Sequence, residues 1–310
     1  MYRIGIDLGG TKIAVGIVDE KNHIAASAVN PTRTELGVEQ VVDDMAGAVM
    51  NALAFSGIDL SECIGIGLGC PGSCDIEAGV VRNAHNLGWD GVPVCTMLQE
   101  RLGLSVFLRN DADCAALGEV VAGAAKGSGS ALLLTLGTGI GGGLVIGGQI
   151  FSGSRGLGGE FGHMCIQMGG ELCTCGQRGC WEAYASATAL IRQAEAAAAA
   201  HPESALAQCG TPDGRKIFAA AAQGDETAKQ VVQQYAEYLG IGLTNLINAF
   251  YPETVLLGGG ISGAGDALLD PLRDYVSTHF FVGNPALLPE IRIAALGSDA
   301  GVIGAAALVI

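Results

Sequence analysis

One histidine and three cysteines gather in a short stretch of the sequence. His163 is followed after nine residues by Cys173, then by Cys175 and, after four more residues, by Cys180. One imidazole nitrogen and three thiolate sulfurs complete a tetrahedral zinc shell, which leaves no open position for water or substrate. The alternative is a group of buried cysteines that act as small hydrophobic side chains, but their close spacing among glycines does not resemble core packing. The pattern therefore predicts a structural Zn²⁺ site that holds a loop.

Two glycine-rich turns repeat one layout, each between two apolar runs, in residues 3–18 and 131–146. The turn residues are Gly9, Gly10, Thr11 and Lys12 in the first copy, and Gly137, Thr138 and Gly139 in the second. Glycines let a backbone approach a phosphate closely, and amide and hydroxyl hydrogens act as donors. Asp7, at the end of the first strand, would then face Mg²⁺. The alternative is a plain hairpin with a surface aspartate, but the internal repeat favours phosphate binding.

The second turn also matches a dinucleotide-binding pattern, because Gly137, Gly139 and Gly142 follow a strand at GxGxxG spacing. Such a fingerprint must open a helix. The residues that follow are glycines and β-branched residues, which form helices poorly. A second strand is therefore expected after the turn, and the dinucleotide interpretation fails.

Apolar patterns place these residues on α/β elements. Helices are expected at residues 38–55, 183–200, 226–249 and 298–310, and strands at 63–68, 105–108 and 254–257. Residues 201–214 are expected to form a surface connection. Several of the strands end in glycine or polar residues, and ligands bind at such strand ends in α/β folds.

Size and charge limit the class of protein. A chain of 310 residues exceeds what one core usually supports, so two domains are expected. A formal net charge of −15 argues against a nucleic-acid partner, because nucleic acids are bound through lysine and arginine. The other cysteines form no disulfide framework, and no signal peptide precedes Arg3, which favours the cytoplasm. Residues 127–154 are uncharged, but glycines divide them into strand, turn and strand, so no membrane partner is expected.

The stretch GEFGHMCIQMGGELCTCGQRGCWE, residues 159–182, is similar to the signature of the ROK family of sugar kinases. The resemblance extends over essentially the whole chain. It implies that His163 and the three cysteines hold zinc, and that Glu160, Glu182 and His163 itself contact sugar hydroxyls. DLGGTK and LGTGIGGG resemble the two phosphate loops of the actin, hexokinase and sugar-kinase superfamily.

The resemblance implies an α/β protein of two actin-like, ribonuclease H-like domains with a cleft between them. The expected small domain is residues 1–117, and the expected large domain, which carries the zinc loop, is residues 118–297. In the family, a final helix such as residues 298–310 returns to pack on the first domain.

The resemblance also assigns three ligand loops. Residues 69–72 resemble the GxPG loop that lies along the sugar, through Gly72. Residues 83–89 resemble the APNLxxW motif, which places Asn86 at the sugar, although His85 stands where proline is usual. Gly259 and Gly260 resemble part of the adenosine-binding loop.

A general base is expected after the strand at residues 105–108. A carboxylate beside a sugar hydroxyl can accept its proton while the hydroxyl attacks the γ-phosphate of ATP. The resemblance selects Asp111 as this base, with Asn110 hydrogen-bonded to the sugar; Asp113 occupies a place where the family often has asparagine. The alternative role for Asp111 is the N-cap of a helix at residues 112–122, and both roles can hold at once.

Taken with the resemblance, these residues predict an ATP-dependent, Mg²⁺-assisted kinase for a hexose, with glucose at its 6-hydroxyl as first choice. N-acetylmannosamine, N-acetylglucosamine, fructose and allose are the alternatives, since family members for all of them share these motifs. A sugar-sensing repressor is a rival from another class. Two features oppose it: the first phosphate-loop strand already begins at Arg3, and both Asp7 and Asp111 are present. A sugar-binding domain without turnover is the third alternative. A homodimer or homotetramer is expected from the family.

Overall fold

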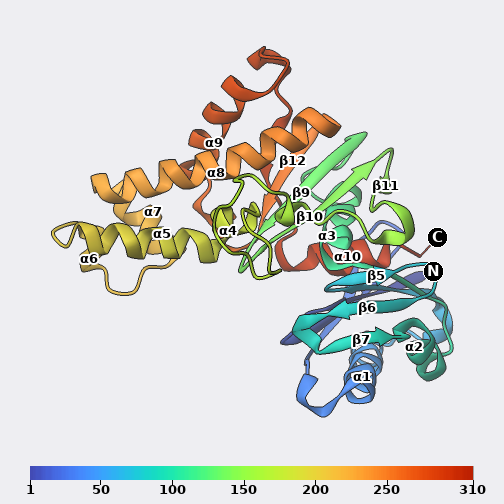
Figure 1. The fold of residues 1–310 in the computed structure, drawn as a ribbon. Coiled ribbons are helices and arrows are strands. Elements are labelled where there is room, and N and C mark those ends of the chain that lie inside the picture. The colour runs from blue at the N-terminus through green and yellow to red at the C-terminus, as the bar shows by residue number, and fades with distance from the viewer. Residues whose placement is uncertain (310) are drawn as a thin grey trace. The chain divides into compact units, whose positions relative to one another are not determined.

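The computed structural model describes residues 1–309 and divides them into two compact units (Figure 1). Unit 1 comprises residues 1–133, 143–159 and the end of the chain from residue 295. Unit 2 comprises residues 134–142 and 160–294. This division differs from the expected boundary after residue 117, which falls inside a helix that continues to Val121.

Unit 1 contains a five-stranded sheet in the order β3-β2-β1-β4-β8. Its strands are β1 (Tyr2–Leu8), β2 (Lys12–Val18), β3 (Ile24–Pro31), β4 (Cys63–Cys70) and β8 (Val106–Asn110). The first three strands are antiparallel, whereas β4 and β8 run parallel to β1. Parallel neighbours bring the ends of β1, β4 and β8 to one edge, so that Asp7 pairs with Gly69 and Cys70 with Asn110.

A small antiparallel sheet and four helices complete unit 1. The small sheet contains β5 (Ser73–Asp75), β6 (Val80–Ala84) and β7 (Trp89–Val92). The helices are α1 (Val38–Ser56), α2 (Val94–Leu102), α3 (Asp111–Val121) and α10 (Ala300–Ala306). Apolar side chains of β1, β2 and β4 pack with those of α1 and α2 in one fully buried core. Burial of this apolar surface is the main driving force for folding of the unit.

Helix α10 packs against β1, β4 and α3 without side chains between the backbones. A methyl group built on Gly5 or Gly67 would overlap a carbonyl oxygen of α10, and one built on Gly304 would overlap the Cys114 carbonyl of α3. Glycine is required at these positions because real Cβ atoms do not approach a backbone so closely. The sequence pattern predicted a helix at residues 298–310; α10 is shorter, and residue 310 lies outside the described residues.

The second sheet has the order β11-β10-β9-β12-β13. Its strands are β9 (Ser130–Leu136), β10 (Ile140–Ile146), β11 (Gln149–Ile150), β12 (Thr254–Gly258) and β13 (Glu290–Ile293). β10 is a strand directly after the Gly137–Gly139 turn, as expected from its glycine and β-branched residues. The helix that a dinucleotide fingerprint requires is therefore not formed there.

The helices of unit 2 pack around a buried tryptophan. They are α4 (Glu182–Ala185), α5 (Ala187–Ala200), α6 (Ala205–Gln208), α7 (Gly214–Ala222), α8 (Glu226–Phe250) and α9 (Asp266–His279). Trp181 is fully buried against Gly242 of α8 and donates from its indole nitrogen to the Tyr238 carbonyl at 2.9 Å. No helix among residues 1–309 is long and apolar enough to cross a membrane.

Two predictions for this unit, one of a helix and one of a surface connection, need correction. The alanine-rich helix expected at 183–200 is interrupted at Ser186, whose hydroxyl caps α5 by accepting from Ala189 N–H at 3.1 Å. The expected surface connection at 201–214 contains the short helix α6, because Leu206 is fully buried.

Candidate active site

Asp7 lies at the end of β1, where it is largely shielded from water. A methyl group on Gly301 of α10 would come within 2.7 Å of the Asp7 carboxyl carbon, so glycine makes room for this carboxylate. The pKa of Asp7 is raised to about 6, mainly by burial and further by the charge of Asp111, while the charge of Lys12 lowers it in part. The fold therefore brings two carboxylates from β1 and α3 into electrostatic contact.

Asp111 is the first residue of α3, and Asn110 is its N-cap. The Asn110 side-chain oxygen accepts from Ala112 N–H at 2.8 Å, so the capping role suggested for Asp111 belongs to its neighbour. Asp111 also accepts from Ala112 N–H, at 2.9 Å. Burial raises the pKa of Asp111, although the backbone hydrogen bond lowers it in part. A carboxylate with a raised pKa is a better proton acceptor.

Asn110 also fixes the loop that follows β4. Its side-chain nitrogen donates to the Gly72 carbonyl at 3.1 Å. Gly72 has φ of +85°, and a side chain there would overlap the Asn83 carbonyl. The backbone of the loop around Gly72 is thus held next to the start of α3, and only glycine fits at this position.

The first glycine turn is closed by the bond from Gly9 N–H to the Lys12 carbonyl, 2.9 Å long. Thr32, which the sequence did not single out, supports the turn from outside: its hydroxyl donates to the Gly9 carbonyl at 2.7 Å and its N–H to the Thr11 carbonyl at 3.0 Å. Thr11 and Lys12 are exposed, so their side chains are accessible to a ligand. No sequence motif marks Thr32, because its role depends on the pairing of β2 with β3.

Asn86 lies beside this turn. A methyl group built on Gly10 would contact the Asn86 Cβ at 3.4 Å, which is an ordinary van der Waals distance. His85, which stands where the motif has proline, begins a short 3₁₀ helix, His85–Leu87, and both His85 and Asn86 are exposed. The loop thus presents Asn86 next to the turn.

The second glycine turn is also closed by a backbone hydrogen bond, one residue shorter in span, from Gly137 N–H to the Gly139 carbonyl at 3.0 Å. The start of α5 supports it: Ala187 N–H donates to the Gly137 carbonyl at 2.8 Å, and the Thr188 hydroxyl donates to the Thr138 carbonyl at 2.9 Å. A third glycine turn adjoins it, because Gly259, with φ of +83°, packs on the backbone of Leu136. Gly260 begins the 3₁₀ helix that follows, Gly260–Ala264.

Glu182 connects the second turn to the cysteine-rich loop. One carboxylate oxygen accepts from Ile140 N–H at 3.0 Å, and the other accepts from the Thr174 hydroxyl at 3.0 Å. The sequence predicted Glu182 only as a sugar ligand. Each carboxylate oxygen has further acceptor capacity, so anchoring and ligand binding are compatible. Glu160 differs, because it is exposed at the start of the 3₁₀ helix Phe161–His163.

The predicted metal ligands converge in unit 2. One ligand atom from each of His163, Cys173, Cys175 and Cys180 lies within 4.8 Å of the others. The Cys173 sulfur is 3.6 Å from the His163 Nδ1, and the Cys175 and Cys180 sulfurs are 3.6 Å apart. Ligands about 2.3 Å from a tetrahedral ion would be about 3.8 Å apart, so the donor set fits a metal ion of this kind.

The chain is similar to known proteins over essentially its whole length. The matching family model is the ROK family, over residues 3–310. A glucokinase from Halalkalibacterium halodurans is 40% identical over 99% of this chain and 94% of its own length. The crystal structure of a ROK family glucokinase from Streptomyces griseus, in complex with glucose and AMPPNP, has a TM-score of 0.83 at 37% identity, covering 100% of this chain and 99% of that one.

A ROK hexokinase from Thermus thermophilus has the same TM-score, 0.83, at 41% identity, and the alignment covers 100% of this chain and 98% of that one. The fold is therefore the mixed α/β, actin-like ATPase fold of these enzymes. Because the family model spans the chain and relatives near 40% identity match almost its full length, the chain belongs to the ROK family.

Proposed function

We propose that this protein is an ATP-dependent, Mg²⁺-assisted sugar kinase that phosphorylates glucose at its 6-hydroxyl. The observation that carries the proposal is Asp111, a half-buried carboxylate with a raised pKa at the end of a sheet, beside Asn110 and the loop at Gly72. Relatives named glucokinase at about 40% identity favour glucose over the other sugars.

Asp111 acts as the general base of the reaction. The 6-hydroxyl oxygen forms a bond to the γ-phosphorus of ATP, the bond from that phosphorus to the β-phosphate oxygen breaks, and the hydroxyl proton passes to Asp111. Asn110, Asn86 and the loop at Gly72 orient the sugar from unit 1. Glu160, His163 and Glu182 are the proposed hydroxyl ligands from unit 2.

The two glycine turns are the proposed phosphate loops. Gly9, Gly10 and Thr11 offer backbone and hydroxyl donors, and the exposed Lys12 offers a positive charge. Gly137, Thr138 and Gly139 form the second loop, and the turn at Gly259 and Gly260 holds the adenosine.

Mg²⁺ and Zn²⁺ have separate proposed sites. The charge of Asp111 raises the pKa of Asp7, so a divalent cation near Asp7 would relieve their repulsion, and carboxylate oxygens are ligands that Mg²⁺ accepts. When bound with ATP, Mg²⁺ neutralises charge on the β- and γ-phosphates. His163, Cys173, Cys175 and Cys180 would hold Zn²⁺ as a closed structural site.

The cellular setting follows from this chemistry. ATP as a substrate and free thiolates as zinc ligands both suit a reducing cytoplasm. The family resemblance further suggests a homodimer or homotetramer, and analytical ultracentrifugation would distinguish these from a monomer.

A coupled assay of ADP release tests the proposal. Glucose, fructose, allose, N-acetylmannosamine and N-acetylglucosamine would be compared at equal concentrations with saturating ATP and Mg²⁺. Glucose is expected to give the highest kcat/KM. A higher kcat/KM for another sugar would show that this sugar, and not glucose, is the preferred substrate, while the protein would still be a kinase. Sugar binding by calorimetry without ADP release from any sugar would instead identify a sensor or binding domain.

A further inference from the structure

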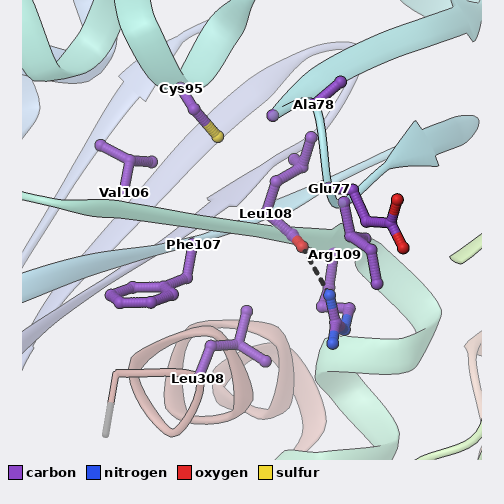
Figure 2. A pocket seen from close by; sticks show the side chains of 10 residues that line it. Glu77, Ala78, Cys95, Val106, Phe107, Leu108, Arg109 and Leu308 are labelled. Atoms are coloured by element: carbon purple, nitrogen blue, oxygen red, sulfur yellow. Dashed lines mark hydrogen bonds between the residues drawn. The ribbon is translucent and has the colours of Figure 1, made fainter. Parts of the chain in front are cut away.

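A cavity of about 300 Å³ lies in unit 1 along β8, and none of its residues belongs to the candidate active site. Figure 2 shows it from close by. Its lining includes Glu77, Cys95, Phe107, Arg109 and Leu308. Its volume is at the lower end of the range for small-molecule sites in proteins.

Arg109 is the unusual residue of this cavity. Its Nε atom is buried and has no hydrogen-bond partner among the described residues. One guanidinium nitrogen donates to the neighbouring Leu108 carbonyl at 3.2 Å, and this is the one hydrogen bond recorded for the side chain within residues 1–309 (Figure 2). Buried N–H groups are normally satisfied by protein, water or ligand, so an unpaired one requires an explanation.

Other arginines of unit 1 contrast with Arg109. Arg33, Arg82 and Arg101 each form an ion pair with a carboxylate. Arg109 forms none within residues 1–309, although the chain has a net charge of −15. The terminal nitrogens of its guanidinium group, which suits planar anions such as carboxylates, are thus available to a ligand.

The cavity wall beside Arg109 is apolar. β8 is the edge strand of its sheet, and alternate side chains of a strand share a face, so Phe107 and Arg109 point to the same side. Leu308 lies next to both in Figure 2. Phe107 is 41% exposed, a large fraction for a phenyl ring. A ligand that contacted Phe107 and Leu308 would remove this apolar surface from water.

The remaining polar groups restrict the charge of a ligand. Cys95 lines the opposite side, and burial raises the pKa of its thiol to about 12, so it is neutral. Glu77 lies beside Arg109 in Figure 2 and is exposed. Its carboxylate and the net charge of −15 would repel a second negative charge on the ligand.

We propose that this cavity binds a small organic monoanion, a carboxylate with a compact apolar body, through Arg109, Phe107 and Leu308. The carboxylate accepts hydrogen bonds from the Arg109 guanidinium, and the apolar body covers Phe107. The site does not depend on the proposed kinase activity, because its residues are separate from those assigned to ATP and sugar.

Isothermal titration calorimetry of the whole chain at low ionic strength tests the site, with phenylacetate and isocaproate as probes and phenylacetamide as the neutral analogue. We expect a Kd of about 1 mM for at least one carboxylate, as befits a ligand of this size. Phenylacetamide should bind at least about tenfold more weakly, because a hydrogen bond to a charged group is lost. Absence of binding by both carboxylates at about 20 mM, a generous margin above the expected Kd, would refute the proposal.

Two variants locate the binding. Arg109→Gln should weaken phenylacetate at least about tenfold and remove its advantage over phenylacetamide. Arg215→Gln, at an exposed arginine of α7, is the matched control and should bind normally. Phe107→Ala should weaken phenylacetate while the preference for carboxylate over amide persists. Thermal unfolding checks that each variant is folded, and unchanged affinity in a folded Arg109→Gln protein would place the anion elsewhere.

Discussion

The two glycine turns of this protein are each closed by a backbone hydrogen bond but are anchored by different chemistry. The first follows Asp7, whose raised pKa places a titratable charge at the end of β1. In the second, Thr135 occupies the corresponding position, and Ile140 N–H donates to the Glu182 carboxylate instead. The first turn therefore lies in the electrostatic environment of Asp111, the proposed base, whereas the second is linked to the proposed metal-binding loop. The two copies of the hairpin therefore have different neighbours, which suit them to different roles.

The largest expected effect concerns the base near the first turn. Asp111→Asn keeps the size of the side chain but removes the proton acceptor, so kcat should fall by about 10²–10⁴-fold. ATP affinity should change little, because the glycine turns are untouched. Steady-state kinetics with glucose and ATP measure both.

Asp113→Asn is the comparison for this variant. Asp113 is 3% exposed within α3 and is not assigned to substrate, so its loss can lower stability but should leave most of kcat in the folded enzyme. An inactive Asp113→Asn beside an active Asp111→Asn would show that the base is the other carboxylate.

The second largest effect concerns the free energy of unfolding. It should depend on pH through Asp7 in the first hairpin, and the second hairpin should make no such contribution. The pKa of Asp7 is raised from 3.8 to about 6 in the folded protein, so its contribution to stability is complete below pH 3.8 and is lost as pH rises through 6. At pH 7.5 the wild type should therefore be less stable than Asp7→Asn by up to about 3 kcal/mol. Urea unfolding without nucleotide or Mg²⁺ measures this difference.

The same measurement at pH 3.5 provides the control, because Asp7 is then largely protonated in both states and the two proteins should be nearly equal. Thr135→Val, at the matching position of the second hairpin, should show no pH-dependent change of this kind. A stability difference for Asp7→Asn that did not depend on pH would mean that packing, not ionisation, is responsible.

The sequence predicted both turns, the four converging metal ligands and a strand at residues 105–108, where β8 is found at Val106–Asn110, because these features follow local rules of spacing and residue type. It did not predict that Asn110 caps α3, that Thr32 supports the first turn or that Glu182 accepts from Ile140 N–H. These contacts depend on distances between segments far apart in sequence. The unpaired Nε of Arg109 could not be predicted either, because the absence of a hydrogen-bond partner leaves no pattern in the sequence.

The third effect tests the link from the metal loop to the second turn. Cys175→Ser should lower bound zinc at least about tenfold, as measured by elemental analysis of the dialysed protein. Thr174, between two ligands, donates to Glu182, so the KM for sugar should also rise. Cys165→Ser, at an exposed cysteine outside the ligand group, should keep both properties. Loss of zinc with an unchanged KM would show that the loop does not organise the sugar site.

The smallest effect compares the turns directly through two alanine substitutions. A methyl group at Gly139 would overlap the Glu182 carboxylate, which must move and give up Ile140 N–H, whereas one at Gly10 would make an ordinary contact with Asn86 at 3.4 Å. Gly139→Ala should therefore raise the KM for sugar severalfold, and Gly10→Ala should raise it less. Equal increases in the KM for sugar would indicate that each methyl group acts only by crowding the phosphates bound at its turn.

The backbone contacts of α10 also have a consequence for how the chain is made. β1 is synthesised long before α10, the helix that covers Gly5 and Gly67, because nearly the whole described sequence separates the two elements. Until α10 is synthesised, the sheet keeps one apolar surface uncovered, and such surfaces make nascent chains prone to aggregation. Completion of unit 1 thus waits until α10 has been synthesised, which makes the nascent chain a natural client for chaperones that bind apolar segments.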